Sequence, residues 1–224
     1  MKPFHYKNPV KNTIAALMLL LAAGFVFCSC QKEITVDNGS GAGGGGGGTT
    51  NQKPKVGTVW TYRYYTYYGF TGGGLATSAV LKLRAKSLDV SGGEQWLNIV
   101  DTDTDTTVFF LNEKTGGLYD YTNSSSYLFC KYPAVVNDTY NSYLSGKTET
   151  VVVKNITDST TIGISGNPVS IPVIYYEGSS GGNIYDKFWY NEYAWIVKRE
   201  TYKVNPFSGY YYRYSTLALD NIVY

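Results

Sequence analysis

Residues 56–68 read VGTVWTYRYYTYY and carry the clearest sign of the fold class. Trp60, Tyr62 and Tyr64 occur at every second position, so their side chains fall on one face of an extended strand. Aromatic residues suit the pleated surface of a sheet. Similar short alternating segments follow along the chain, separated by clusters of Gly, Asn, Asp and Ser. A spacing of about 8–12 residues is typical of an all-β sandwich or barrel.

About a dozen strands are expected from these segments. They cover residues 58–68, 79–88, 94–101, 106–112, 118–121, 126–131, 149–156, 160–164, 169–177, 183–190, 194–203 and 210–224. Ser91-Gly92-Gly93 and Gly181-Gly182 are predicted hairpin turns, and short connections imply antiparallel neighbours. We therefore predict an all-β antiparallel meander curled into a barrel or half-barrel. A two-sheet β-sandwich is the alternative, because alternation does not distinguish one closed sheet from two packed sheets. Any helix is expected between residues 133 and 143.

The first 29 residues have the pattern of a secretory signal peptide. Lys2, Lys7 and Lys11 precede an apolar run from Ile14 to Phe27, and small residues follow it. A transmembrane anchor that stays in place is the alternative reading. The run is shorter than the roughly 20 apolar residues that span a bilayer, which favours the signal peptide.

Ser29-Cys30 makes this segment resemble a bacterial lipoprotein signal. In that family a peptidase cleaves before the Cys, whose thiol carries a diacylglyceryl group with fatty acids such as palmitate. The resemblance implies lipidation at Cys30 rather than Cys28, because the bulky Phe27 precedes Cys28. Gln31 stands where Asp holds such proteins at the inner membrane. The resemblance therefore implies an outer-membrane location, facing the periplasm or the outside.

Residues 30–55 are predicted to be a flexible linker, because they contain the unbroken run Gly43–Gly48. At about 5–6 Å × √n, a linker of this length holds the following domain some 25–30 Å from the lipid on average. Residues 56–224 are long enough for a single β-domain. The anchor makes the membrane a partner without requiring the chain to span it.

Charge and histidine content exclude several function classes. Three of the 19 Lys and Arg residues and none of the 17 Asp and Glu residues lie in residues 1–29, so the mature chain has a net charge of −1. This charge favours no nucleic-acid partner. The single histidine, His5, leaves with the signal, so His-based triads and zinc sites are not expected. No cofactor is indicated. Cys130 is expected to be a buried apolar residue without a disulfide partner.

Tyrosine is unusually abundant, at 23 of 224 residues, and occurs on both faces of single strands. Exposed aromatic planes can stack on flat ligands such as sugar rings. Tyr64, Tyr67 and Tyr211 are therefore candidate binding residues for a glycan or an apolar ligand. The simpler interpretation is that the aromatic rings cover the sheet while their hydroxyl groups remain in contact with solvent.

Acidic residues suggest two weaker possibilities. Asp101, Asp103 and Asp105 could offer oxygen ligands to calcium, although a solvated acidic turn is the simpler interpretation. A glycosidase would need two carboxyl groups about 5–10 Å apart in a cleft. Its candidates are Asp120, Asp186, Glu177, Glu192 and Glu200.

Two segments extend the resemblance into the β-domain. PKVGTVWTYRY at residues 54–64 and FWYNEYAWIVKRETY at residues 188–202 resemble motifs of uncharacterised Bacteroidota-type outer-membrane lipoproteins. Thr58 and the pair Ala194-Trp195 depart from the usual Asn and Gly pair. The resemblance implies a curled antiparallel sheet, and we expect Trp60 and Trp195 to pack together where the first and a late strand meet.

Function is predicted mainly by exclusion. The leading hypothesis is a non-catalytic binding or accessory lipoprotein of the cell envelope that binds a glycan or an apolar ligand through a Tyr/Trp-rich face. The alternatives are a carboxylate-dependent hydrolase such as a glycosidase and a structural envelope-assembly protein.

Overall fold

The computed structural model describes residues 52–69 and 74–224, which belong to the unit Gly47–Tyr224. The predicted signal peptide, Cys30 and residues 30–51 of the predicted linker lie outside the described residues. In the described part of the chain, no helix is long and apolar enough to cross a membrane. Its strands are β1 (Val59–Tyr67), β2 (Leu75–Ser91), β3 (Glu94–Asp101), β4 (Thr107–Lys114), β5 (Gly116–Thr122), β6 (Ser125–Tyr132), β7 (Thr139–Leu144), β8 (Lys147–Ile164), β9 (Asn167–Ser180), β10 (Asn183–Asn191), β11 (Trp195–Val204) and β12 (Tyr211–Val223).

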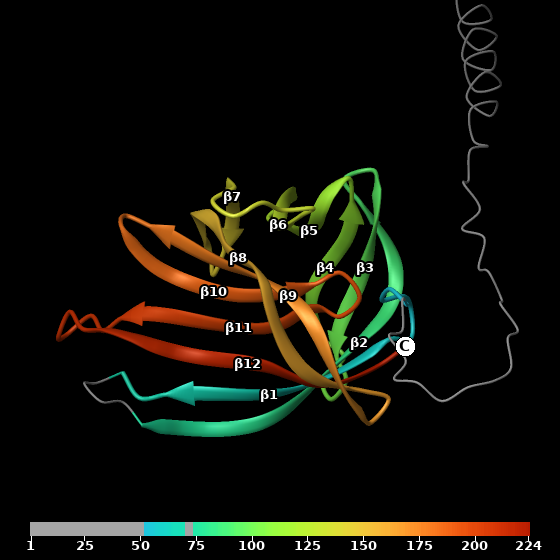
Figure 1. Ribbon diagram of the computed structural model, residues 1–224, viewed down its shortest axis with the longest axis horizontal. Coiled ribbons are helices and arrows are strands. Elements are labelled where there is room, and N and C mark those ends of the chain that lie inside the picture. Colours follow the sequence, from blue (N-terminus) through green and yellow to red (C-terminus); the bar gives the residue numbers. More distant parts are fainter. Residues whose placement is uncertain (1–51, 70–73) are drawn as a thin grey trace, which may run out of the picture. The chain divides into compact units, whose positions relative to one another are not determined.

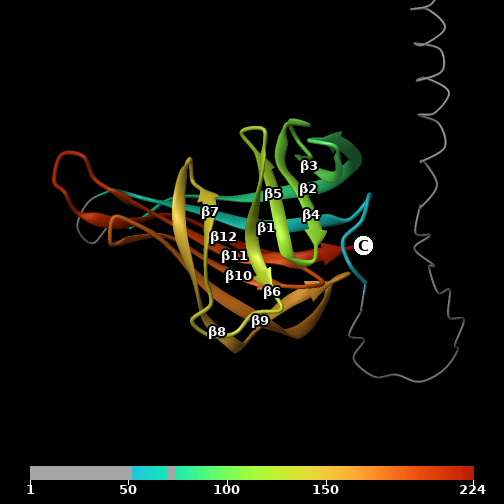
Figure 2. The same cartoon turned by 90° about the horizontal axis from the view of Figure 1, so that it is seen from above.

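These strands form one sheet in the order β6-β5-β4-β3-β2-β1-β12-β11-β10-β9-β8-β7 (Figure 1). Pairing of β1 with β12 joins the first and second halves of the chain. The far end of β8 also runs parallel to β12, where Gly163 and Ile164 pair with Asn221 and Ile222. The sheet therefore curls back on itself (Figure 2). The predicted all-β meander is confirmed, and one partly closed sheet replaces the alternative of two packed sheets.

Hairpin turns of two residues join many neighbouring strands. The predicted turns Gly92-Gly93 and Gly181-Gly182 are present, and both residues of each have a positive φ. Ser145-Gly146 is a further turn of this kind between β7 and β8. Positive φ at both central positions gives the twist that matches paired strands. The segment in which any helix is expected, residues 133–143 of the described chain, holds no helix; β7 begins there at Thr139 and pairs with β8.

Two tryptophans anchor the core, as the sequence predicts. The rings of Trp60 and Trp195 stack with centroids 6.0 Å apart. The Trp60 indole N–H donates to the Ala194 carbonyl at 3.0 Å, and the Tyr62 hydroxyl donates to the Ile196 carbonyl at 2.8 Å. β12 lies between β1 and β11 in the sheet, so these long side chains reach across one strand.

The two edge strands of the sheet, β6 and β7, meet through side chains. The Tyr140 hydroxyl on β7 donates to the Phe129 carbonyl on β6 at 2.7 Å, and the Tyr176 hydroxyl on β9 donates to the Lys131 carbonyl at 2.6 Å. Cys130, between these two acceptors, is fully buried, as expected. We call these two hydrogen bonds the tyrosine seam. They close the half-barrel where no strand pairing does so in the described sheet.

Candidate ligand-binding site

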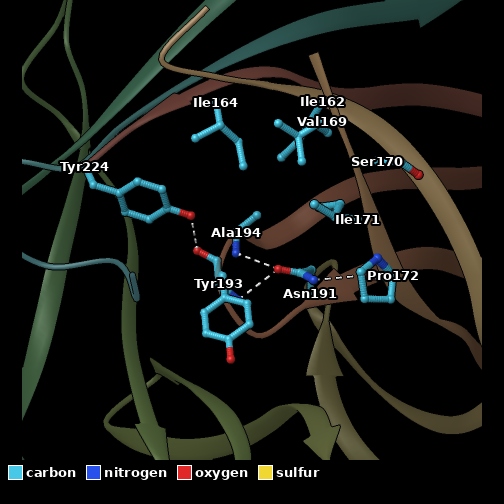
Figure 3. A pocket seen from close by; sticks show the side chains of 10 residues that line it. All are labelled: Ile162, Ile164, Val169, Ser170, Ile171, Pro172, Asn191, Tyr193, Ala194 and Tyr224. Carbon is cyan, nitrogen blue, oxygen red and sulfur yellow. Dashed lines mark hydrogen bonds between the residues drawn. The ribbon is translucent and has the colours of Figure 1, made fainter. Parts of the chain in front are cut away.

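An apolar pocket of about 250 Å³ lies between the β8–β9 hairpin, the β10–β11 turn and the last residue of the chain (Figure 3). Its lining residues are Ile162, Ile164, Val169, Ser170, Ile171, Pro172, Asn191, Tyr193, Ala194 and Tyr224. The hairpin supplies most of the aliphatic side chains, because alternate positions of β8 and β9 face this side of the pair.

Hydrogen bonds hold the other wall of the pocket in place. The Asn191 amide donates to the Pro172 carbonyl at 2.8 Å. Its carbonyl oxygen accepts from the backbone N–H groups of Tyr193, at 2.8 Å, and Ala194, at 3.0 Å. The Tyr224 hydroxyl donates to the Tyr193 carbonyl at 2.7 Å. These bonds tie the β10–β11 turn to the hairpin on one side and to the chain end on the other, so the pocket is preformed.

The pocket's polar atoms are largely occupied by the protein itself. The Asn191 side chain makes three hydrogen bonds, and the partner in each is a backbone group. In Figure 3 the ring of Tyr193 and the hydroxyl of Ser170 point away from the isoleucine side chains. A molecule in the pocket therefore meets mainly aliphatic carbon. None of the binding residues predicted from the sequence lines this pocket; the alternation of Ile162 with Ile164 signalled a buried face but not a cavity.

The predicted binding tyrosines divide between the two faces of the sheet. Tyr65 pairs with Thr216, and Tyr67, two residues further along β1, places its hydroxyl 3.4 Å from the Thr216 hydroxyl. Tyr67 and Tyr65 therefore share a face. Tyr64 pairs with Leu217 and lies on the opposite face, so it does not join Tyr67.

Tyr67 and Tyr211 belong to one row of stacked and ion-paired side chains. The Arg213 guanidinium lies 4.2 Å from the Tyr67 ring centroid and 3.4 Å from Glu200. Glu200 accepts from the Tyr202 hydroxyl at 2.8 Å, and the Tyr202 and Tyr211 rings stack at 5.2 Å. Tyr67 and Tyr211 are thus connected through three intervening residues.

The row continues across the strands β11, β10 and β9. Lys198 lies 2.8 Å from Glu200 and 4.4 Å from the Trp189 ring centroid. Trp189 stacks on Tyr175 with centroids 4.7 Å apart. We call the connected set the aromatic band. Its members are Tyr67, Tyr175, Glu177, Lys187, Trp189, Lys198, Glu200, Tyr202, Tyr211 and Arg213.

Two of the carboxyl groups proposed for a glycosidase, those of Glu177 and Glu200, lie on this face and are held in ion pairs with lysine or arginine side chains. Glu177 and Glu200 flank Lys187 in the strand register, two strand spacings of about 4.8 Å apart. Burial acts to raise the pKa of Glu200, but hydrogen bonds from Lys198 and Tyr202 outweigh it and lower that pKa. A general acid needs a raised pKa, so Glu200 is not suited to this role.

The other three candidates lie apart from that row. Burial raises the pKa of Asp120 on β5 to about 6. Glu192 lines a different cavity beside Tyr132. Asp186 on β10 is fully buried, and Arg199 holds it through its Nε at 2.8 Å and its Nη2 at 2.7 Å.

Asp186 has an acidic neighbour that the sequence did not reveal. Glu149 on β8 is also fully buried, and neither of its carboxyl oxygens has a hydrogen-bond donor within reach. Lys147 is 3.8 Å away. Burial first, and then the charge of Asp186, raise the pKa of Glu149 to about 8. Neither acid lines the pocket of Figure 3 or the cavity beside Tyr132.

The possible calcium ligands form an acidic turn. The Asp101 carboxylate accepts the backbone N–H of Asp103 at 2.8 Å, while Asp105 pairs with Lys86 and lies 3.6 Å from Arg84. The hydrogen bond from Lys86 lowers the pKa of Asp105. In the described chain, no group of three or more acidic, His or Cys side chains is arranged to hold a metal ion.

Comparison with known proteins adds little to these observations. No protein-family model and no curated protein matches the chain. One solved structure, described as a candidate lipoprotein from Parabacteroides distasonis, covers 76% of this chain and 97% of its own at 12% identity, with a TM-score of 0.33. A likeness of this degree assigns neither family nor function.

Proposed function

We propose that the protein is a non-catalytic binding lipoprotein of the cell envelope, held at the outer membrane by a diacylglyceryl group on Cys30. The support is the order of basic head, apolar run and Ser29-Cys30 at the N-terminus. Metabolic labelling with a fatty acid tests the anchor. Cys30→Ala should abolish labelling and leave uncleaved precursor, whereas Cys28→Ala should change neither. Labelling that survives Cys30→Ala and disappears with Cys28→Ala contradicts the assignment.

The ligand of the β-domain is an aliphatic chain, and its site is the pocket of Figure 3. The observation that carries this proposal is the composition of the walls: aliphatic side chains, with the Asn191 amide already bonded to the backbone. A sugar or a peptide backbone in this pocket would leave its own polar groups unpaired, which costs about 1–3 kcal/mol for each group. A hydrocarbon chain carries no such cost.

The pocket has room for several methylene groups. Its volume is about 250 Å³, whereas an apolar cavity of about 150 Å³ accepts benzene. Each buried methylene contributes about 0.8 kcal/mol, which is roughly a fourfold gain in affinity. A short acyl chain therefore reaches a measurable affinity without any polar contact, provided that its carboxyl group stays at the open end.

Calorimetric titration with butyrate, hexanoate, octanoate and decanoate tests the acyl site. The affinity should rise about fourfold for each added methylene until the pocket is full. Val169→Phe fills the pocket from the hairpin side and should reduce octanoate binding by about tenfold or more. Val108→Phe, at an exposed position on β4, is the matched control. Affinity that is independent of chain length, or unchanged by Val169→Phe, contradicts the proposal.

A further inference from the structure

A second cavity, of about 350 Å³, lies where the aromatic band passes beneath β8. We call it the Trp189 groove. Its lining residues are Asp158, Ser159, Thr160, Thr161, Val173, Trp189, Val197, Lys198, Ala218 and Leu219. No residue lines both this groove and the pocket of Figure 3. The parallel pairing of Gly163 and Ile164 with β12 holds the end of β8 over the neighbouring strands and so forms the wall of the groove.

We propose that the Trp189 groove binds a glycan, with Trp189 as the platform for a sugar ring. Sugar rings present apolar C–H faces that stack on aromatic planes, and tryptophan offers the largest such plane. The half-buried Trp189 ring lies between the near-parallel Tyr175 ring, 4.7 Å away at 15°, and the Lys198 ammonium group, 4.4 Å from its centroid. A sugar ring therefore stacks on Trp189 by displacing Lys198, which stays paired with Glu200. Tyr175 is itself fixed, because its hydroxyl donates to Glu177 at 2.5 Å. The platform is therefore ordered before a ligand arrives.

The opposite wall supplies hydrogen-bonding groups of the kind that sugar hydroxyls need. Ser159, Thr160 and Thr161 follow one another along β8 and border the groove. Because side chains alternate along a strand, the part-buried Thr160 shares a face with Asp158, while the exposed Ser159 and Thr161 lie on the other face. Among the described residues, none of these three hydroxyls has a side-chain hydrogen-bond partner. Asp158 is positioned by the Asn155 amide at 2.7 Å. A hydroxyl can donate and accept at once, so this wall matches the mixed donors and acceptors of a sugar.

Charges around the groove favour glycan over an apolar ligand. Lys198 lies between Trp189, whose ring centroid is 4.4 Å away, and Glu200, at 2.8 Å. Glu177 is flanked by Lys154 at 3.8 Å and Lys187 at 3.7 Å. An aliphatic ligand bound over these ion pairs would remove their water and would offer no hydrogen bonds in its place. A hydrated, hydroxyl-rich ligand leaves them solvated.

Tyr202 and Tyr211 extend the platform along the band. Their parallel rings lie 5.2 Å apart, and Tyr202 is linked to the Trp189 side through Glu200 and Lys198. A glycan longer than one residue therefore has further aromatic faces along its path. This inference gives the predicted Tyr211 a role along the path of a longer glycan, outside the groove itself, and leaves Tyr64 without one.

Affinity electrophoresis in native gels containing dextran, xylan or polygalacturonate tests the proposal. The protein should be retarded by at least one of these polysaccharides. Retardation by the neutral polysaccharides dextran or xylan indicates recognition by stacking and hydroxyl contacts. Retardation by the acidic polygalacturonate alone indicates recognition that also uses the charge of Lys198. Trp189→Ala should weaken the retardation about tenfold, and Trp189→Phe should retain part of it, because a smaller plane remains.

Tyr127→Ala is the matched control, because Tyr127 and Tyr143 form another aromatic pair, on β6 and β7, with centroids 5.4 Å apart. It should leave the retardation unchanged. Melting temperatures of the variants identify any loss of fold, and octanoate binding checks that the pocket of Figure 3 is intact. The proposal is wrong if no polysaccharide retards the wild type. It is also wrong if folded Trp189→Ala is retarded as strongly as the wild type, or if Tyr127→Ala weakens binding equally.

Discussion

Glu149 is an acidic side chain removed from water. Its carboxyl group is fully buried beside Asp186. Arg199 and the Ser145 hydroxyl, at 2.8 Å, are both committed to Asp186. Burial, and then the charge of Asp186, favour Glu149 as the neutral acid. A proton on Glu149 supplies a hydrogen-bond donor between the two carboxyl groups.

The raised pKa of Glu149 predicts a stability that falls as pH rises. The folded protein binds this proton up to pH about 8, whereas the unfolded chain releases it near the ordinary value of about 4.3. Asp120, with a pKa of about 6, acts in the same direction only at lower pH. Between pH 6 and 8 the free energy of unfolding should therefore fall by up to about 1.4 kcal/mol per pH unit.

Urea unfolding between pH 5 and 9 measures this slope. Glu149→Gln removes the titration and keeps a donor for Asp186, so its free energy of unfolding should be nearly flat between pH 6 and 8. Asp103→Asn, at an exposed position in the acidic turn, should keep the wild-type slope. An unchanged slope in Glu149→Gln would assign the effect to other groups.

At the scale of elements, the β5–β6 hairpin brings two backbones close together at Gly117. Gly117, the second residue of β5, has φ +142°. A Cβ at this position would lie 2.0 Å from the Cys130 carbonyl and 2.9 Å from the Tyr132 nitrogen. Both contacts are with backbone atoms, so the strands themselves must move apart to admit a side chain.

Gly117→Ala should therefore lower the free energy of unfolding by about 3 kcal/mol or more, as expected for overpacking against rigid atoms. Gly146, in the β7–β8 turn, offers a matched control, because it also has a positive φ, +84°, but no atom lies within 4 Å of the added Cβ. Gly146→Ala should cost only the about 1–2 kcal/mol of the left-handed conformation. If Gly117→Ala and Gly146→Ala lower the free energy of unfolding equally in urea or thermal unfolding, then β5 and β6 can move apart without an energetic cost.

At the scale of the whole molecule, the half-barrel depends on how its two edge strands meet. The register of β5 with β6 skips Phe129, so its carbonyl is free to accept from the Tyr140 hydroxyl. The rings of Phe129, Phe188 and Tyr176 stack behind this point, with successive centroids 5.3 and 5.0 Å apart. The tyrosine seam thus joins the first half of the meander to the second at the edge opposite the β1–β12 pairing.

Removing both seam hydroxyls should loosen this closure without unfolding the sheet. Tyr140→Phe and Tyr176→Phe should each cost about 1 kcal/mol, and up to about 3 kcal/mol where the carbonyl is left unpaired. In the double variant, amide hydrogen exchange should accelerate in β6 and β7 more than in β10 and β11. Tyr143→Phe removes a β7 hydroxyl that donates to Gly146 outside the seam, and it should leave β6 unaffected. Uniform acceleration across the sheet would contradict a local role.

The sequence by itself determined the strand class and the glycine turns. Both follow from local rules: a period of two along strands and a positive φ at turns. The same period implies that Tyr64 and Tyr67, three residues apart, lie on opposite faces of an unbulged strand, so this part of the site was readable in advance.

The tertiary structure alone decided which distant residues meet. The pocket requires the β8–β9 hairpin to lie against the β10–β11 turn and Tyr224, and the acid pair requires Glu149 and Asp186 to converge from β8 and β10. These contacts depend on register shifts, such as the one between Ile184 and Asp186, and on the parallel contact of β8 with β12. Strand alternation specifies the face on which a side chain lies, but the position of that face relative to another strand is set by packing of the whole sheet.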